Sequence, residues 1–178
     1  MTKEEKYAGL MPQVRGLCEG EEDMIAKMAN VCALLHREFG FWWTGFYRVK
    51  PHPQPLSFQE RGVDSADSPS LGRRGGQGGE AGLVLGPFQG PLACVHIGYG
   101  KGVCGTAWKE RRTVVVPDVE QFPGHIACSS ESRSEIVVPV FEGEEVMAVL
   151  DIDSRELATF DETDRKWLEE VCRCLAQR

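Results

Sequence analysis

The stretch that decides the fold is residues 134–154, Ser-Glu-Ile-Val-Val-Pro-Val-Phe-Glu-Gly-Glu-Glu-Val-Met-Ala-Val-Leu-Asp-Ile-Asp-Ser. It contains two apolar runs, 135–141 and 145–153, whose valine and isoleucine content predicts β-strands. Glu-Gly-Glu at 142–144 separates the runs and has the composition of a hairpin turn. The stretch therefore predicts two adjacent antiparallel strands, and the rest of the fold can be built outward from this hairpin.

Further strands and helices are predicted on both sides of the hairpin. Strands are expected at 41–49, 83–85, 92–97 and 113–116, where apolar, aromatic or β-branched residues concentrate. Helices are expected at 4–18, 21–38, 102–110 and 161–175, the last with Asp161 as a plausible N-cap. Helices at both ends of the chain around an antiparallel meander predict an α+β sandwich.

Residues 51–82 break every pattern of regular structure. They hold four prolines and seven glycines, together with serines and few apolar residues, so they cannot bury a core of their own. Strand signals resume directly afterwards, and the part of the chain before this segment is too small to fold alone. We therefore expect a flexible insertion between two strands of a single domain that spans residues 1–178.

Composition and charge exclude several classes of function. The chain of 178 residues carries a net charge of −7, which argues against binding nucleic acid or an anionic membrane surface. The first residues lack the apolar core of a signal peptide, and no apolar run is long enough to span a bilayer. A cytoplasmic protein is therefore expected, in which thiols stay reduced at rest.

Seven cysteines are present, an odd number that cannot all pair within one chain. Cys94, Cys104 and Cys128 lie within 35 residues of one another, each beside glycine or small residues. Cys104 is expected near a helix start, where amides and the helix dipole stabilise a thiolate. Cys94 is expected near a strand end and Cys128 in a loop. A single such cysteine is more often a small buried hydrophobe, but three together favour redox chemistry.

The other four cysteines lie on apolar helix faces or at helix ends and are expected to be inert: Cys18, Cys32, Cys172 and Cys174.

Carboxylates and aromatic rings offer the second set of candidate residues. Asp151 and Asp153 are two apart on a strand, so they point to the same face, and their repulsion raises the pKa of one of them. Such a pair can hold an ammonium ion, or keep a proton to donate to an oxygen. Glu135, at a strand start, is weak evidence alone. Trp43 and Tyr47 share a strand face and can form a core or the wall of a pocket.

Other chemistries find little support in the sequence. Cys94, Cys104, His125 and Cys128 could supply soft metal ligands, but the usual zinc spacing is absent, so no metal site is expected. The chain has no nucleophile elbow of a serine hydrolase, and no phosphate-binding loop or dinucleotide fingerprint follows a strand.

Taken together, the motifs resemble one family. They are Leu83 to Gly90, Ala93-Cys94-Val95, Gly100 to Ala107, Gly124 to Cys128, Ser134 to Val137 and Val149 to Ser154. This combination is similar to the free methionine-(R)-sulfoxide reductases, which are GAF-domain enzymes. The resemblance covers nearly the whole chain outside residues 51–82. It implies a six-stranded antiparallel sheet with packed helices, reduction of the free amino acid methionine-(R)-sulfoxide, and thioredoxin as the reductant, without a cofactor.

The resemblance also implies roles for the candidate residues. Cys128 matches the catalytic cysteine, Cys94 the resolving one, and Cys104 a third cysteine that is auxiliary in some members. The substrate-binding carboxylates are matched by Glu135, Asp151 and Asp153, and the aromatic pocket wall by Trp43 and Tyr47. Either Cys94 or Cys104 could reach Cys128 first, and a homodimer is compatible with this fold. The rival interpretations are a noncatalytic GAF ligand sensor and a structural zinc protein that uses the three motif cysteines.

Overall fold

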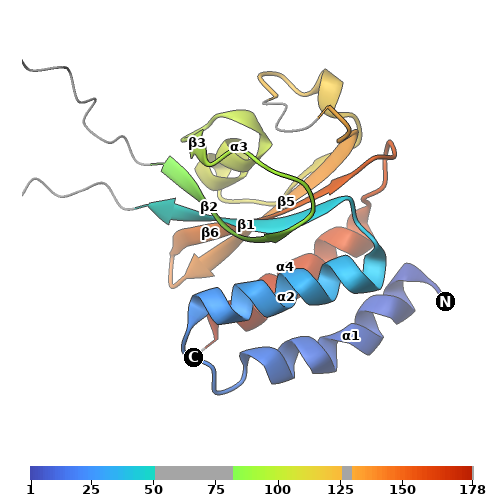
Figure 1. Cartoon of the computed structure of the whole chain (residues 1–178), viewed down its shortest axis with the longest axis vertical. Coiled ribbons are helices and arrows are strands. Elements are labelled where there is room, and N and C mark those ends of the chain that lie inside the picture. The colour runs from blue at the N-terminus through green and yellow to red at the C-terminus, as the bar shows by residue number, and fades with distance from the viewer. Residues whose placement is uncertain (51–81, 126–129, 178) are drawn as a thin grey trace, which may run out of the picture.

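The computed structural model describes residues 1–50, 82–125 and 130–177, and its centre is the predicted hairpin (Figure 1). Strands β5 (Ser134–Glu142) and β6 (Glu145–Ser154) pair antiparallel along their whole length. The described residues form one six-stranded antiparallel sheet in the order β3-β2-β1-β6-β5-β4. Its other strands are β1 (Trp43–Lys50), β2 (Gly82–Gln89), β3 (His96–Gly98) and β4 (Val114–Val116).

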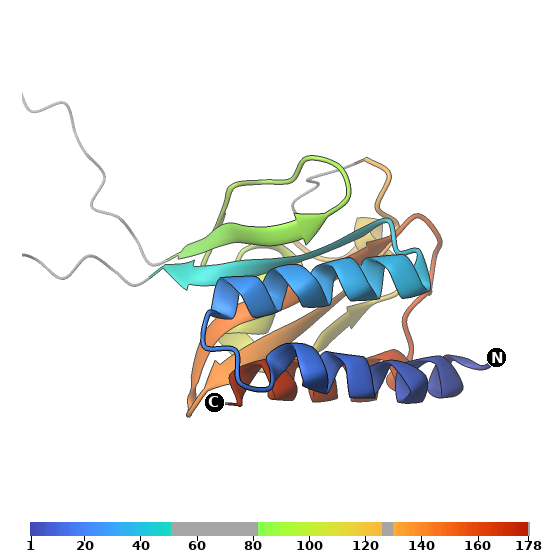
Figure 2. The same ribbon diagram turned by 60° about the horizontal axis from the view of Figure 1, so that its bottom comes forward.

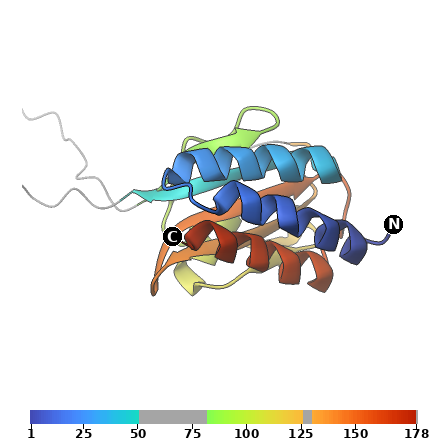
Figure 3. The same ribbon diagram turned by 90° about the horizontal axis from the view of Figure 1, so that it is seen from below.

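Helices cover both faces of the sheet, which gives the α+β architecture that the sequence predicts. On one face lie α1 (Lys3–Cys18), α2 (Met24–Phe39) and α4 (Glu162–Ala176), seen from the side in Figure 2 and in front of the sheet in Figure 3. On the other face lie α3 (Gly102–Glu110), the short 3-10 helix η1 (Val119–Gln121) and the loops around them.

The alternation of side chains along the strands divides the core into two layers. Phe46, Leu150 and Ile152 are fully buried in the layer under α1, α2 and α4. Tyr47 and Val149 are buried in the layer that faces α3. Strands buried on both faces need apolar residues at nearly every position, which explains the continuous apolar runs in the sequence. Each fully buried large side chain contributes about 1.5–3 kcal/mol.

Polar side chains fix the helix ends that support this core. The carboxylate of Asp23 accepts hydrogen bonds from the first amides of α2, so the helix begins at Met24 rather than at the predicted residue 21. Asp161 caps α4 as predicted, in a reciprocal arrangement with Asp164. The hydroxyl of Tyr7 donates to Asp164 at 2.9 Å, which ties α1 to the start of α4.

The strand predicted at 92–97 is wrong in extent, because only His96–Gly98 pairs with β2. Residues 92–95, including Cys94, form a loop instead. The pairing between β2 and β3 ends at Val84 and His96, and one further hydrogen bond joins the Leu85 N–H to the Val95 carbonyl. Beyond it, Pro87 of β2 has no N–H to donate, and the register of β2 against β1 shifts nearby. Cys94 therefore lies on a loop that crosses the edge of the sheet rather than inside a strand.

The two strands around the expected insertion are neighbours. Lys50 at the end of β1 pairs with Gly82 at the start of β2, so both strands are in register across the segment between them. Gly82, expected as the last residue of the insertion, belongs to the strand. Residues 51–81, on which the expectation of a flexible insertion falls, lie outside the described residues.

In the described part of the chain, no helix is both long enough and apolar enough to cross a membrane.

Candidate functional site

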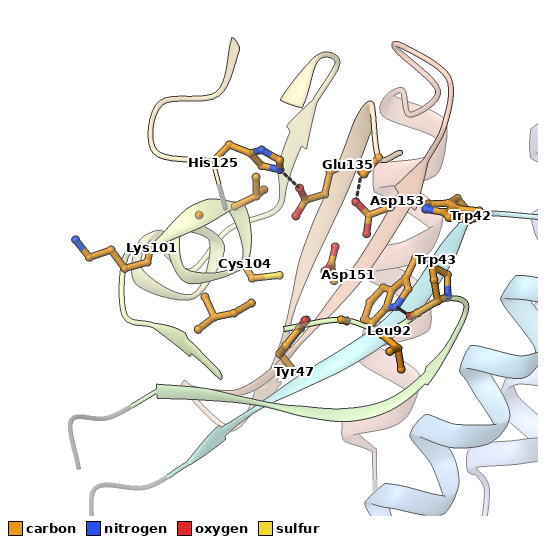
Figure 4. Close-up of a pocket in the computed structure, with 16 residues that line it drawn as sticks. Trp42, Trp43, Tyr47, Leu92, Lys101, Cys104, His125, Glu135, Asp151 and Asp153 are labelled. Atoms are coloured by element: carbon orange, nitrogen blue, oxygen red, sulfur yellow. Dashed lines mark hydrogen bonds and ion pairs between the residues drawn. The ribbon is translucent and has the colours of Figure 1, made fainter. Parts of the chain in front are cut away.

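A pocket opens between the sheet and α3, on the face opposite the three long helices (Figure 4). It encloses about 580 Å³, including space open to solvent. One wall is aromatic and comes from β1, another comes from the loop before β3 and from the start of α3, and its floor carries the carboxyl groups of β5 and β6.

Strand register explains why the three predicted carboxyl groups meet. Strand β6 lies between β1 and β5, so Trp43, Asp153 and Glu135 form one row across three strands. Asp151 occupies the next row on the same face, opposite Gly45. Residues two apart on a strand share a face, so the row and its neighbour point together into the pocket.

Burial makes these carboxyl groups hard to ionise. Glu135 and Asp151 are each only 6% exposed. Burial raises the pKa of both groups well above the usual range, and the negative charges of their carboxyl neighbours raise it further. The cluster therefore holds a proton near neutral pH, as the spacing of the two aspartates predicted.

Asp153 is the carboxyl group of the three whose pKa is raised least. Burial raises the pKa of Asp153 to about 6, while a hydrogen bond donated by the Ser132 hydroxyl lowers it. Asp153 therefore carries a negative charge at neutral pH. Beside it, Asp151 Oδ1 is buried and has no hydrogen-bond partner among the described residues, which leaves an acceptor open to a ligand.

His125 closes the cluster on the side away from β1. Its Nε2 atom lies 3.8 Å from Glu135 Oε2. Burial lowers the pKa of His125, so the imidazole is neutral at pH 7 and offers a polar contact rather than a positive charge. A neutral neighbour leaves the proton on the carboxyl groups.

Cys104 faces the carboxyl groups from the first turn of α3, and here the expectation of a stabilised thiolate is wrong. Burial raises the pKa of the Cys104 thiol well above its usual value, and Asp151 and Glu135 raise it further. A helix N-terminus is worth about 0.3–1 kcal/mol to an anion, which is too little to offset desolvation next to carboxyl groups. Cys104 is therefore a protonated thiol, and its sulfur lies within 4.8 Å of a carboxyl oxygen of Asp151.

Cys104, Glu135 and Asp151 are also the described residues that could share a metal ion, because one ligand atom from each lies within 4.8 Å of the others. This set differs from the combination of Cys94, Cys104, His125 and Cys128 that was weighed from the sequence.

The aromatic wall also positions the loop before β3. The rings of Trp43 and Tyr47 stack with their centroids 6.0 Å apart. The indole of Trp43 donates a hydrogen bond to the carbonyl of Pro91 at 3.1 Å, and the hydroxyl of Tyr47 donates to the carbonyl of Cys94 at 3.0 Å. The two predicted wall residues thus fix the backbone of the loop that carries Cys94 at the pocket edge.

Of the cysteines that the structure describes, one is disulfide-bonded and five are free thiols. Cys94 is disulfide-bonded. Cys128 lies outside the described residues, so its predicted role is not addressed by the geometry. The four cysteines expected to be inert are buried free thiols, and burial raises the pKa of each: Cys18, Cys32, Cys172 and Cys174.

Sequence reasoning missed several residues of the pocket. Ser132 lies in a loop with no pattern that marks it, and only the fold brings its hydroxyl to Asp153. His125 was considered only as a metal ligand, and its approach to Glu135 depends on how the loop after η1 returns to the sheet. Leu92 and Trp42 line the pocket too, and the Arg155 guanidinium covers the ring of Trp42 at 3.4 Å from its centroid.

A six-stranded antiparallel sheet with helices on both faces and a polar pocket beneath a short helix defines a GAF domain, and residues 29–177 match the family described as GAF domain. The chain is 45% identical to GAF domain-containing protein A of Dictyostelium discoideum, over 98% of this chain and 92% of that protein. It is 36% identical to the free methionine-R-sulfoxide reductase of Escherichia coli, over 96% of this chain and 87% of that protein.

Among solved structures, the chain is similar to the free methionine-R-sulfoxide reductase from Neisseria meningitidis in complex with its substrate. The TM-score is 0.81 at 42% identity, and the match covers 99% of this chain and 89% of that one. The chain therefore belongs to the free methionine-R-sulfoxide reductase family of GAF-domain proteins.

Proposed function

We propose that this protein reduces free methionine-(R)-sulfoxide to methionine with cysteine thiols, and that thioredoxin restores the thiols afterwards. The observation that carries the proposal is the cluster of Glu135, Asp151 and Asp153, which holds both a proton and a negative charge at neutral pH. This cluster lies under an aromatic wall and beside the loop of Cys94. A zwitterionic sulfoxide needs these two features, an anion for its ammonium group and a proton for its oxygen.

The pocket accounts for the choice of a free amino acid. The negative charge of Asp153 and the open acceptor Asp151 Oδ1 suit an ammonium group. The faces of Trp43 and Tyr47 suit the methyl and methylene groups next to the sulfur. A methionine sulfoxide residue within a peptide has no ammonium group, so binding would leave buried carboxyl groups without their partner, which is costly.

The reaction needs a proton at the sulfoxide oxygen, because unprotonated oxygen is a poor leaving group. We assign this proton to the Glu135 and Asp151 carboxyl groups, whose pKa values are raised by burial. The Cys128 thiolate attacks the sulfoxide sulfur, the oxygen is transferred to Cys128 as a sulfenic acid, and methionine leaves. The Cys94 thiol then condenses with the sulfenic acid, which forms a disulfide and releases water.

Cys94 is the better candidate for the resolving cysteine on two grounds. It lies on a loop at the pocket edge and is disulfide-bonded, whereas Cys104 is a buried thiol whose raised pKa keeps it protonated. A thiol must ionise to attack, so Cys104 would resolve a sulfenic acid slowly. An external dithiol then reduces the disulfide by two exchange steps, which fits thioredoxin in a reducing cytoplasm.

The test is NADPH oxidation in an assay coupled through thioredoxin reductase and thioredoxin. The substrates are free methionine-(R)-sulfoxide, its S epimer and N-acetylated methionine-(R)-sulfoxide. We expect turnover of the free R form alone and its loss in Cys128→Ser, with Cys174→Ser as the matched cysteine control that keeps activity. Absence of turnover with every substrate, together with tight binding of another small molecule, would replace the proposal with a GAF ligand sensor.

A further inference from the structure

Exposed apolar side chains gather around the disulfide-bonded Cys94. Leu92 is 89% exposed, Val95 57% and Tyr99 53%. The other large hydrophobic residues exposed in the described part of the chain, Met1, Ile25 and Leu157, are single residues far apart in the sequence. Single exposed apolar residues are common on protein surfaces. Three such residues within eight positions form an apolar patch, and this patch surrounds the disulfide-bonded Cys94. We call Leu92, Val95 and Tyr99 the 92–99 surface.

Hydrogen bonds from buried strands fix the backbone of the loop that carries this surface. The Val95 carbonyl accepts a hydrogen bond from Leu85 of β2 at 3.0 Å, and the Cys94 carbonyl accepts one from Tyr47. Both bonds use the backbone of the loop, and the side chains of Leu92 and Val95 remain exposed. The Tyr99 ring packs edge-on against Trp108, with centroids 4.7 Å apart, and Tyr99 as a residue remains half exposed. The three apolar side chains are therefore held at the surface and do not pack into the core.

The surface also differs in charge from the rest of the protein. The chain carries a net charge of −7, yet no Asp or Glu occurs from Gly82 to Lys109. Lys101 and Lys109 lie in this part of the chain, and the ammonium group of Lys101 points away from the carboxyl cluster (Figure 4). A thiolate that approaches Cys94 is an anion, so the lack of carboxylates in the stretch of chain around Cys94 favours its approach.

We propose that the 92–99 surface is the docking site for a dithiol reductase, which seats an apolar, low-charge face there and attacks the sulfur of Cys94. The inference rests on the proposed function and adds the place where the reductant binds. A disulfide can be reduced by exchange only if the partner's sulfur reaches it, so the partner's own surface must cover the residues beside Cys94. The partner needs only a small, transient contact, which three apolar side chains can supply.

The disulfide of Cys94 is reduced in two thiol–disulfide exchange steps. The partner's first thiolate attacks the Cys94 sulfur, which forms a mixed disulfide and releases the cysteine bonded to Cys94 as a thiolate that takes up a proton. The partner's second thiol, after losing its proton, attacks its own first sulfur. Cys94 then leaves as a thiolate, is protonated, and the partner departs with a disulfide. Two electrons pass from the partner to the protein.

The test compares turnover driven by thioredoxin with turnover driven by dithiothreitol, a small dithiol that needs no docking surface. In Val95→Asp we expect the KM for thioredoxin to rise about tenfold or more, the effect of losing one central apolar contact of an interface. The KM for the sulfoxide and the rate with dithiothreitol should stay as in the parent protein. Leu157→Asp, which alters an apolar residue that is 45% exposed elsewhere, should change none of these quantities.

Three outcomes overturn the inference. An unchanged KM for thioredoxin in Val95→Asp means that the reductant docks elsewhere. A loss of dithiothreitol-driven turnover in Val95→Asp means that Val95 supports the fold or the pocket rather than docking. A parent protein that is dimeric and becomes monomeric through Val95→Asp means that a second copy covers the surface.

Failure of the proposed function would be seen separately. The parent protein would then reduce no sulfoxide with either reductant, while thioredoxin oxidation by the pre-formed Cys94 disulfide still reports docking. In that assay a rate about tenfold lower in Val95→Asp than in Leu157→Asp supports the inference, and equal rates contradict it.

Discussion

Replacing Asp153 by Asn should make the protein more stable and less active, because the pocket stores unfavourable electrostatic energy. The pKa of Asp153 rises from 3.8 to about 6 on folding because the group is buried. Ionising it above pH 7 therefore costs about 3 kcal/mol more in the folded than in the unfolded chain. Asn is close in shape and still accepts the hydrogen bond from Ser132, but it has no charge to desolvate.

Proton binding by Asp153 determines how the free energy of unfolding changes with pH. Between about pH 4 and pH 6 the folded protein holds the Asp153 proton and the unfolded chain does not, so the free energy of unfolding of the parent protein falls as pH rises through this range. Asp153→Asn removes this dependence. The variant should therefore gain up to about 3 kcal/mol over the parent between pH 4 and pH 8.

Urea denaturation under reducing conditions, near pH 4 and near pH 8, measures the difference. Asp161→Asn is the control: burial raises the pKa of Asp161, but hydrogen bonds from Lys3 and the α4 amides outweigh it and lower that pKa. Because this group changes its protonation below about pH 4, the stability of that variant relative to the parent should be almost the same at both pH values. In the sulfoxide assay, kcat/KM of Asp153→Asn should fall about a hundredfold, since one partner of a buried charge pair is worth about 2–5 kcal/mol.

An Asp153→Asn variant whose stability relative to the parent is the same at both pH values would refute the reasoning, because Asp153 would then be ionised as easily in the fold as in the unfolded chain. Greater stability with full activity would keep the electrostatic account and remove Asp153 from substrate binding.

Two further predictions concern the same pocket. If the Cys104 thiol acts as a hydrogen-bond donor to Asp151, Cys104→Ser should keep several times more kcat/KM than Cys104→Ala in the thioredoxin assay, whereas a resolving cysteine would lose activity equally in both variants. Gly45→Ala should lower the urea midpoint by an amount equivalent to about 1–3 kcal/mol and change the tryptophan fluorescence, because its methyl group would overlap the Trp43 ring and lie 2.6 Å from Phe88 Cβ; unchanged stability would show that the wall can shift freely.

The amino-acid sequence by itself determined the elements and most of their ends. The apolar runs on both sides of residues 142–144 predicted β5 and β6, and Asp161 marked the start of α4, because strand alternation and helix capping are local properties. Asp151 and Asp153 share a face for the same reason, since two residues along any strand point the same way. The family resemblance added the six-stranded antiparallel sheet, and the match to the GAF domain family confirms it.

The tertiary structure decided which residues meet and what burial does to them. Only the order β1-β6-β5 places Trp43, Asp153 and Glu135 in one row, because strand neighbours are not written in the local sequence. The loop conformation that places the Ser132 hydroxyl beside Asp153 could not be predicted from the sequence either. Cys104 shows the limit most clearly: its place at a helix start predicted a thiolate, but the depth of the pocket and the carboxyl groups opposite keep its proton in place, because desolvation depends on everything that surrounds a group.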